Sequence, residues 1–202
     1  YISQATEYGT LYTLAELEAI RKVCTKYDMP LFIDGARLGY ALTATGNDVT
    51  LEDIARIADV FYIGGTKVGA MFGEAVVFTH GNMPKNFVTL VKQHGALLAK
   101  GWLLGVQFDT LFTDDLYCRI ARHANDAADR IREVLVERGY TLTFDAPTNQ
   151  IFITLDNATS GRLQRNVRLG FMEKADDTHT VMRICTSWAT TDEQVEQLIA
   201  LL

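Results

Sequence analysis

The fold follows from the stretch Leu31-Phe32-Ile33-Asp34-Gly35-Ala36-Arg37. A second stretch of the same kind, Val60-Phe61-Tyr62-Ile63-Gly64-Gly65-Thr66-Lys67, stands after one predicted helix. Both begin as apolar, β-forming runs and stop at glycine beside a charged side chain. Charged groups at such strand ends gather at the carboxyl edge of a parallel sheet, where ligands bind. We therefore expect Asp34 and Lys67 to lie together at one sheet edge.

An aspartate and a lysine at such an edge suit pyridoxal 5'-phosphate (PLP). This cofactor needs a lysine for its Schiff base and a carboxylate that keeps its pyridine nitrogen protonated. Both residues also have ordinary explanations, because exposed lysines commonly follow strands and an aspartate there often caps a turn. The small residues before Lys67 and the apolar run from Val68 to Gly73 favour the cofactor role.

The composition excludes several classes of function. The chain has 202 residues, is 48% hydrophobic and carries a net charge of −6, which argues against a nucleic-acid partner or an anionic membrane surface. No apolar span has transmembrane length and nothing resembles a signal peptide, so we expect a cytoplasmic protein. Cys24, Cys118 and Cys185 are widely spaced; we expect them to be reduced and to bind no metal.

Capping signals divide the chain into alternating strands and helices. Thr13 with Glu16, and Thr50 with Asp53, each predict a helix start. This rhythm of apolar strands and helices indicates a parallel sheet covered on both faces. Further strands are expected at 74–78, 149–155 and 181–186, and further helices at 84–112, 114–138, 161–169 and 191–202. We expect a large domain over residues 1–112 and a smaller α/β domain, antiparallel or mixed, over residues 113–202.

Three further basic residues are candidates for binding anions. Arg37 would lie one helical turn from Asp34, where it could serve the cofactor's phenolic oxygen or a substrate carboxylate. Arg183, in the strand Val181-Met182-Arg183-Ile184-Cys185, either faces solvent or binds a carboxylate in two-pronged fashion. Lys92, in a glycine-rich helical region, is either solvated or a phosphate contact.

The start of the chain resembles the end of a strand rather than the start of a domain. It opens at Tyr1, and no glycine-rich turn precedes a helix in the manner that holds a phosphate. Either the chain is not a PLP enzyme or the phosphate cup lies upstream of Tyr1. We expect a fragment of a longer protein.

Taken together, these residues show that the chain resembles the low-specificity threonine aldolases. This group belongs to the β-eliminating lyases among the fold type I (aspartate-aminotransferase-like) PLP enzymes. The resemblance spans essentially all 202 residues, and the Asp-Gly-Ala-Arg and Thr-Lys blocks in this order are specific. Five motifs carry it: S-Q-A-T-E-Y-G-T-L-Y-T from Ser3, F-I-D-G-A-R-L-G-Y-A-L from Phe32, G-G-T-K-V-G-A-M-F-G-E-A-V-V-F from Gly64, K-Q-H-G-A-L-L-A-K-G-W-L-L-G-V-Q-F from Lys92 and M-R-I-C-T-S-W from Met182.

The resemblance implies an α/β fold and a role for each candidate residue. Residues 1–112 would complete the large PLP domain with its parallel-rich sheet. Lys67 would be the Schiff-base lysine, with Thr66 beside the cofactor, and Asp34 the partner of the pyridinium nitrogen. Arg37 and Arg183 would contact anions of the cofactor or substrate.

The resemblance also implies an assembly and a missing segment. Lys92 matches a family position that reaches the phosphate of a neighbouring subunit's cofactor, which implies a homodimer or homotetramer with shared active sites. Family members carry an N-terminal segment with a phosphate-binding Gly-Thr turn and a histidine that stacks on the pyridine ring. Neither is in this sequence, so the chain would be the C-terminal portion of an aldolase.

The implied function is the reversible cleavage of a β-hydroxy-α-amino acid, such as threonine or allo-threonine, to glycine and an aldehyde. Two alternatives stand beside it. Another PLP-dependent lyase could use the same lysine and aspartate to eliminate a β-substituent, and a non-catalytic fragment could serve assembly only. We expect the isolated fragment to be inactive. The sequence identifies no general base, which could be a water molecule or the missing histidine.

Overall fold

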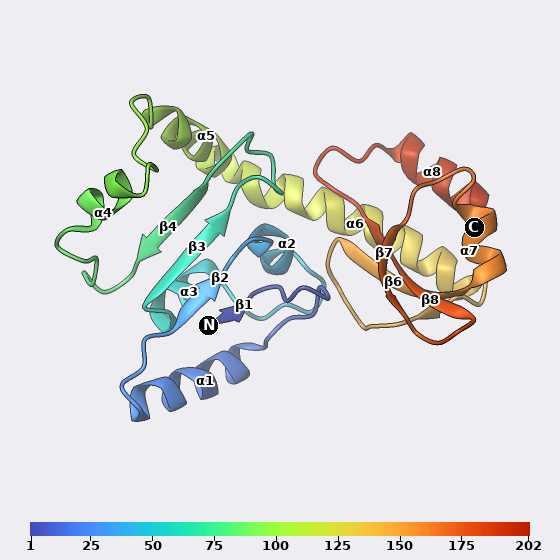
Figure 1. Cartoon of the computed structure of the whole chain (residues 1–202), viewed down its shortest axis with the longest axis horizontal. Coiled ribbons are helices and arrows are strands. Elements are labelled where there is room, and N and C mark those ends of the chain that lie inside the picture. The colour runs from blue at the N-terminus through green and yellow to red at the C-terminus, as the bar shows by residue number, and fades with distance from the viewer.

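The computed structural model describes residues 1–202 and contains two four-stranded sheets, bridged by one long helix (Figure 1). The first sheet has the order β1 (Ile2–Ser3), β2 (Phe32–Asp34), β3 (Val60–Gly64) and β4 (Glu74–Phe78). β2 is parallel to both β1 and β3, whereas β4 runs antiparallel to β3. The sheet is therefore parallel-rich, as the sequence predicted.

Three helices accompany this sheet: α1 (Leu14–Lys26), α2 (Leu38–Leu42) and α3 (Leu51–Ile57). Both predicted capping boxes are present, at Thr13 for α1 and at Thr50 for α3. The spacing of Leu14, Leu17, Ile20 and Val23 predicts an apolar stripe on α1, and this is wrong at Val23, which is exposed. Cys24 is buried in its place, since it lies seven residues after the buried Leu17 and so returns to the same helix face.

The region predicted as one helix over 84–112 contains two, α4 (Phe87–Gln93) and α5 (Trp102–Phe112). Gly95 lies between them with a φ of 73°. This left-handed conformation ends a helix, and glycine adopts it without the steric penalty of a Cβ. The single helix expected over 84–112 is therefore broken after α4.

The second sheet has the order β5 (Thr141–Leu142), β6 (Gln150–Asp156), β8 (His179–Cys185) and β7 (Gly170–Lys174). All its pairings are antiparallel, one of the two arrangements expected. β5 and β7 were not predicted. The helix expected over 161–169 is instead α7 (Asn157–Leu163), because the Asp156 side chain accepts backbone N–H groups at 158 and 159 and starts the helix earlier.

The bridging helix is α6 (Leu116–Glu137), which follows a 3₁₀ turn (Thr113–Asp115) and ends before Gly139, as predicted. Its first half buries Tyr117, Ala121 and Ala124 in the core of the first sheet. Its second half joins the core of the second sheet, with Ile131 and Leu135, where α8 (Asp192–Leu201) also packs. Because α6 belongs to both cores, the domain boundary at residues 112 and 113 stays a prediction. No helix is long and apolar enough to cross a membrane.

The segments that leave β2 and β3 touch at the level of the backbone. The Gly64 N–H donates to the Gly35 carbonyl oxygen at 2.9 Å. A Cβ atom on Gly35 would lie 1.9 Å from the Tyr62 carbonyl oxygen, and one on Gly64 would lie 2.4 Å from the Ala36 carbonyl oxygen. Only glycine therefore fits at either position.

We expect Gly35→Ala to lower the free energy of unfolding by roughly 1–3 kcal/mol, because the new methyl group meets backbone that cannot move aside cheaply. Urea unfolding of the protein measures this change. Gly161→Ala is the matched control: its Cβ meets open space, and alanine in a helix is favoured over glycine by up to about 1 kcal/mol. Equal stabilities of the two variants would contradict the close approach.

Candidate active site

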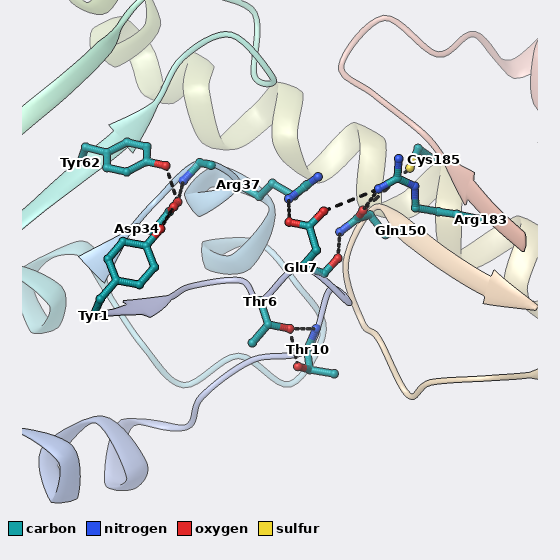
Figure 2. A network of polar contacts seen from close by, with 11 residues as sticks. Tyr1, Thr6, Glu7, Thr10, Asp34, Arg37, Tyr62, Gln150, Arg183 and Cys185 are labelled. Carbon is teal, nitrogen blue, oxygen red and sulfur yellow. Dashed lines mark hydrogen bonds and ion pairs between the residues drawn. The ribbon is translucent and has the colours of Figure 1, made fainter. Parts of the chain in front are cut away.

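Asp34 ends β2 and receives hydrogen bonds from both sides (Figure 2). The hydroxyl groups of Tyr1 and Tyr62 each donate to one oxygen of its carboxylate, and the Ala36 N–H donates at 2.9 Å. Burial opposes ionisation of this carboxyl group. The three hydrogen bonds and the nearby charge of Lys67 outweigh burial, so the pKa of Asp34 lies below its ordinary value. At neutral pH, Asp34 is thus an ionised acceptor at the carboxyl edge of the sheet.

Lys67 follows β3 at the same edge, in a loop that the protein holds from both sides. The buried Tyr40 donates its hydroxyl to the Lys67 carbonyl oxygen, and burial raises the pKa of Tyr40 to about 12, so this hydroxyl remains a donor. The Gly65 N–H donates to a carboxylate oxygen of Glu74 at 2.7 Å. The lysine side chain itself is exposed and forms no ion pair.

The apolar run after Lys67 is only partly enclosed. Val68 and Ala70 are buried, whereas Met71 is 86% exposed. Thr66 is also exposed, and its hydroxyl donates to Glu74 at 3.4 Å. The apolar run expected from Val68 to Gly73 is therefore enclosed only in its first half.

Arg37 and Arg183 meet at the carboxylate of Glu7 (Figure 2). Arg37 directly precedes α2, and its Nη1 lies 3.5 Å from Oε2 of Glu7. Arg183 comes from β8, and its Nη1 lies 3.9 Å from Oε1 of Glu7 and 3.2 Å from Oε1 of Gln150. Because Arg37 follows the first sheet and Arg183 lies in the second, the site is formed between the two halves of the chain.

The structure does not bring Lys92 to this site. Lys92 is exposed on α4, which lies beside β4 at the end of the sheet away from α2 (Figure 1). Within one chain, Lys92 is therefore separated from Asp34 and Lys67.

Sequence reasoning missed Tyr62, Tyr40, Glu7 and Gln150. A signal existed for Tyr62, because β2 and β3 pair Ile33 with Phe61, and the next residues along are Asp34 and Tyr62. Glu7 in an ordinary loop and Gln150 at a strand start carry no comparable signal. The positions of Glu7 and Gln150 beside the arginines depend on how the two sheets are placed relative to each other.

Comparison with known proteins places the chain in a family. The sequence model of the family described as beta-eliminating lyase matches residues 1–158. The chain belongs to the beta-eliminating lyase family. It is 31% identical over 198 residues to the low specificity L-threonine aldolase of Pseudomonas aeruginosa and 30% identical over 200 residues to that of a Pseudomonas species. These alignments cover 98% of this chain but 56% and 57% of the relatives, so the chain spans a little over half of their length.

Solved structures confirm the fold class. The threonine aldolase of Leishmania major is 42% identical, with a TM-score of 0.96, and the match covers 100% of this chain and 59% of that one. A serine palmitoyltransferase of Sphingomonas wittichii, at 17% identity and a TM-score of 0.69, shows a likeness of fold alone, with 99% of this chain and 52% of that chain covered. These are PLP enzymes of fold type I, and the predicted family and fold are both confirmed.

The residues present fit the ring of PLP, the cofactor of this family. Asp34 is ionised and can accept a hydrogen bond from a protonated ring nitrogen. The amine of Lys67 forms no ion pair with a carboxylate. Gly64 and Gly65, which separate the two residues in the sequence, are buried and closely packed: a Cβ on Gly65 would lie 2.7 Å from the Gly73 carbonyl oxygen. This edge therefore carries the carboxylate and the amine that the ring of PLP requires.

We expect Tyr62→Phe to raise the pKa of Asp34 toward its ordinary value, since a donor to the charged form is removed. Titration of the Asp34 carboxyl carbon by NMR measures the change. Tyr27→Phe, on the exposed end of α1, is the control and should leave the titration unaltered. An unshifted Asp34 titration in Tyr62→Phe would rule out the proposed cause.

Proposed function

We propose that the full-length protein cleaves β-hydroxy-α-amino acids such as threonine and allo-threonine to glycine and acetaldehyde, in a reversible reaction. One observation carries the proposal: the edge with Asp34 and Lys67 adjoins a pair of arginines that can bind a carboxylate. A site with an amine-reactive end and a carboxylate-binding end suits an α-amino acid. The similarity to low specificity L-threonine aldolases supports this choice of substrate class.

In this proposal the side chains of Asp34, Lys67 and Thr66 hold PLP. The cofactor, when bound, supplies an electron sink that stabilises negative charge on Cα of the amino acid. Asp34 would keep the proton on the ring nitrogen, since its own pKa is lowered and it stays ionised. Lys67 would bind the cofactor covalently through its amine, and Tyr40 and Glu74 would fix the loop on which it stands.

Arg37 and Arg183 would bind the carboxylate of the amino acid. Their side chains are only 14% and 28% exposed, so water competes weakly for them. With the carboxylate fixed at one end and the amine at the other, the remaining substituent of Cα is constrained in direction. This constraint would align the Cα–Cβ bond for cleavage. A water molecule, or the histidine that the family resemblance places in a preceding segment, would take the proton from the β-hydroxyl.

Incubation of the full-length protein with PLP and threonine should yield equal amounts of glycine and acetaldehyde. Lys67→Ala should abolish this reaction, and borohydride should fix PLP to the wild-type protein but not to this variant. Lys85→Ala, which removes an exposed lysine elsewhere, is the control and should behave like wild type. A 2-oxo acid and ammonia in place of glycine would instead establish an eliminating lyase.

The working assembly, we propose, is a homodimer or homotetramer with shared active sites. The segment from α4 to α5 exposes a group of apolar side chains: Val88, Leu90, Leu97, Leu98, Trp102 and Val106. Soluble monomers rarely expose many large apolar side chains on one segment. Lys92 lies on this same segment, away from Asp34 of its own chain. We propose that a second copy packs here and that Lys92 then lies near the cofactor phosphate of that copy. The partners would thus be a second copy and a small amino acid.

Light scattering of the full-length protein should show a dimer or tetramer. Trp102→Glu should shift the mass toward the monomer, because burial of an unpaired charge opposes association. Val23→Glu introduces the same charge on α1, at another exposed apolar residue, and should leave the mass unchanged. A wild-type monomer would contradict the proposed assembly.

The cytoplasm is the location that we propose for the full-length protein. All three cysteines are unpaired in the structure, which suits a reducing compartment. Recovery of the protein from a secreted fraction of the cells would contradict this location.

A further inference from the structure

We propose that Glu7 is a built-in carboxylate that occupies the Arg37–Arg183 pair until the carboxylate of an amino acid displaces it. This inference rests on the proposed function, because it takes the two arginines as the carboxylate-binding end of the site. Glu7 would then be a specificity residue that sets how tightly amino acids bind.

The geometry places one carboxylate between two guanidinium groups. Oε2 of Glu7 faces Arg37 at 3.5 Å, and Oε1 faces Arg183 at 3.9 Å (Figure 2). A substrate carboxylate that engaged both arginines would need to place its own two oxygens in the same space. The two carboxylates therefore compete for one position.

The Glu7 side chain is held loosely enough to leave. Both distances exceed the 2.7–2.9 Å typical of a charge-assisted hydrogen bond, and the side chain is 69% exposed. An exposed ion pair of this kind contributes little to stability. An amino acid that is also anchored through its amine therefore needs only a modest gain in binding free energy to displace the Glu7 side chain.

The arginine on the second sheet has support that does not depend on Glu7. Arg183 donates to Oε1 of Gln150 at 3.2 Å, and Gln150 is completely buried. Gln150 in turn donates through Nε2 to the backbone carbonyl oxygen of Glu7 at 3.2 Å. Gln150 thus fixes both the guanidinium group and the backbone from which the Glu7 side chain extends.

The loop around Glu7 is fixed at further points. The Thr6 N–H donates to the Thr10 carbonyl oxygen at 3.0 Å, and the Thr10 N–H donates to the Thr6 hydroxyl at 3.2 Å. The Gly9 carbonyl oxygen accepts a hydrogen bond from the Thr148 hydroxyl at 3.1 Å. Because the backbone is tied on both sides, exchange needs a rotation of the Glu7 side chain and no movement of the loop.

The test measures ligand binding by the full-length, PLP-loaded protein with Glu7 and with Glu7→Gln, which keeps the size and removes the charge. Glycine and acetate should each bind about two- to fivefold more tightly to Glu7→Gln, the range expected for loss of an exposed ion pair. Methylamine lacks a carboxylate and should bind equally to both proteins. Glu18→Gln removes a carboxylate paired with Arg56 at 3.0 Å and is the control, with wild-type binding of all three ligands.

Two further variants separate occupancy from a general electrostatic field. Glu7→Asp keeps the charge but withdraws it by about one carbon–carbon bond, ~1.5 Å, so glycine affinity should fall between those of wild type and Glu7→Gln. In an Arg183→Leu background, Glu7→Gln should tighten glycine binding far less, because the bridged pair no longer exists.

The inference is overturned if glycine binds to Glu7→Gln no better than to wild type. It is also overturned if Glu7→Asp matches wild type while Glu7→Gln tightens, because the effect is then one of charge alone. Failure of the proposed function would be distinguishable, since it would appear as a lack of threonine cleavage while glycine binding by the same proteins remained measurable.

Discussion

The edge that carries the candidate active site depends on one backbone contact, the hydrogen bond from the Gly64 N–H to the Gly35 carbonyl oxygen. Asp34 directly precedes Gly35, and Lys67 follows Gly64 by three residues. This contact therefore fixes the separation of the two segments that carry Asp34 and Lys67. The buried Tyr117 adds a second tie: its hydroxyl accepts the Gly39 N–H at 3.0 Å and donates to the Gly64 carbonyl oxygen at 2.9 Å. Burial raises the pKa of Tyr117, so the hydroxyl keeps its proton.

Because Tyr117 belongs to α6, the same helix that completes the first core also fixes the second half of the site. Asn125, two turns further along α6, donates to the Tyr40 carbonyl oxygen and to the Thr43 hydroxyl, each at 2.9 Å. At the end of β8, the Thr186 hydroxyl donates to the Ala124 carbonyl oxygen at 2.6 Å. The segments that carry Arg37 and Arg183 are therefore both tied to one helix, which explains how residues from separate halves of the chain can share one carboxylate.

The parts of this structure that the sequence predicted are those with local causes. A threonine followed by an acid three residues later starts a helix wherever it occurs, and a strand that stops at Asp34 or before Lys67 places its charge at the sheet edge by connectivity alone. The break at Gly95 and the strand β7 were missed because helical and strand patterns of short segments overlap. Glu7 and Gln150 were missed for a different reason: their role exists only once the second sheet is placed against the first, and no spacing in the sequence encodes that placement.

The charges of the site are arranged so that each half-buried group already faces an opposite one. Asp34 lies within the field of Lys67, and Glu7 faces both Arg37 and Arg183. An unpaired guanidinium group in a partly desolvated site would be costly, and a resident carboxylate removes that cost while leaving the arginines in position. In the proposed exchange, an amino acid would bring no new kind of interaction to this end of the site, because one carboxylate would replace another. The free energy available for its binding would be the difference between the two contacts, so the strength of the Glu7 contact would control the affinity for amino acids.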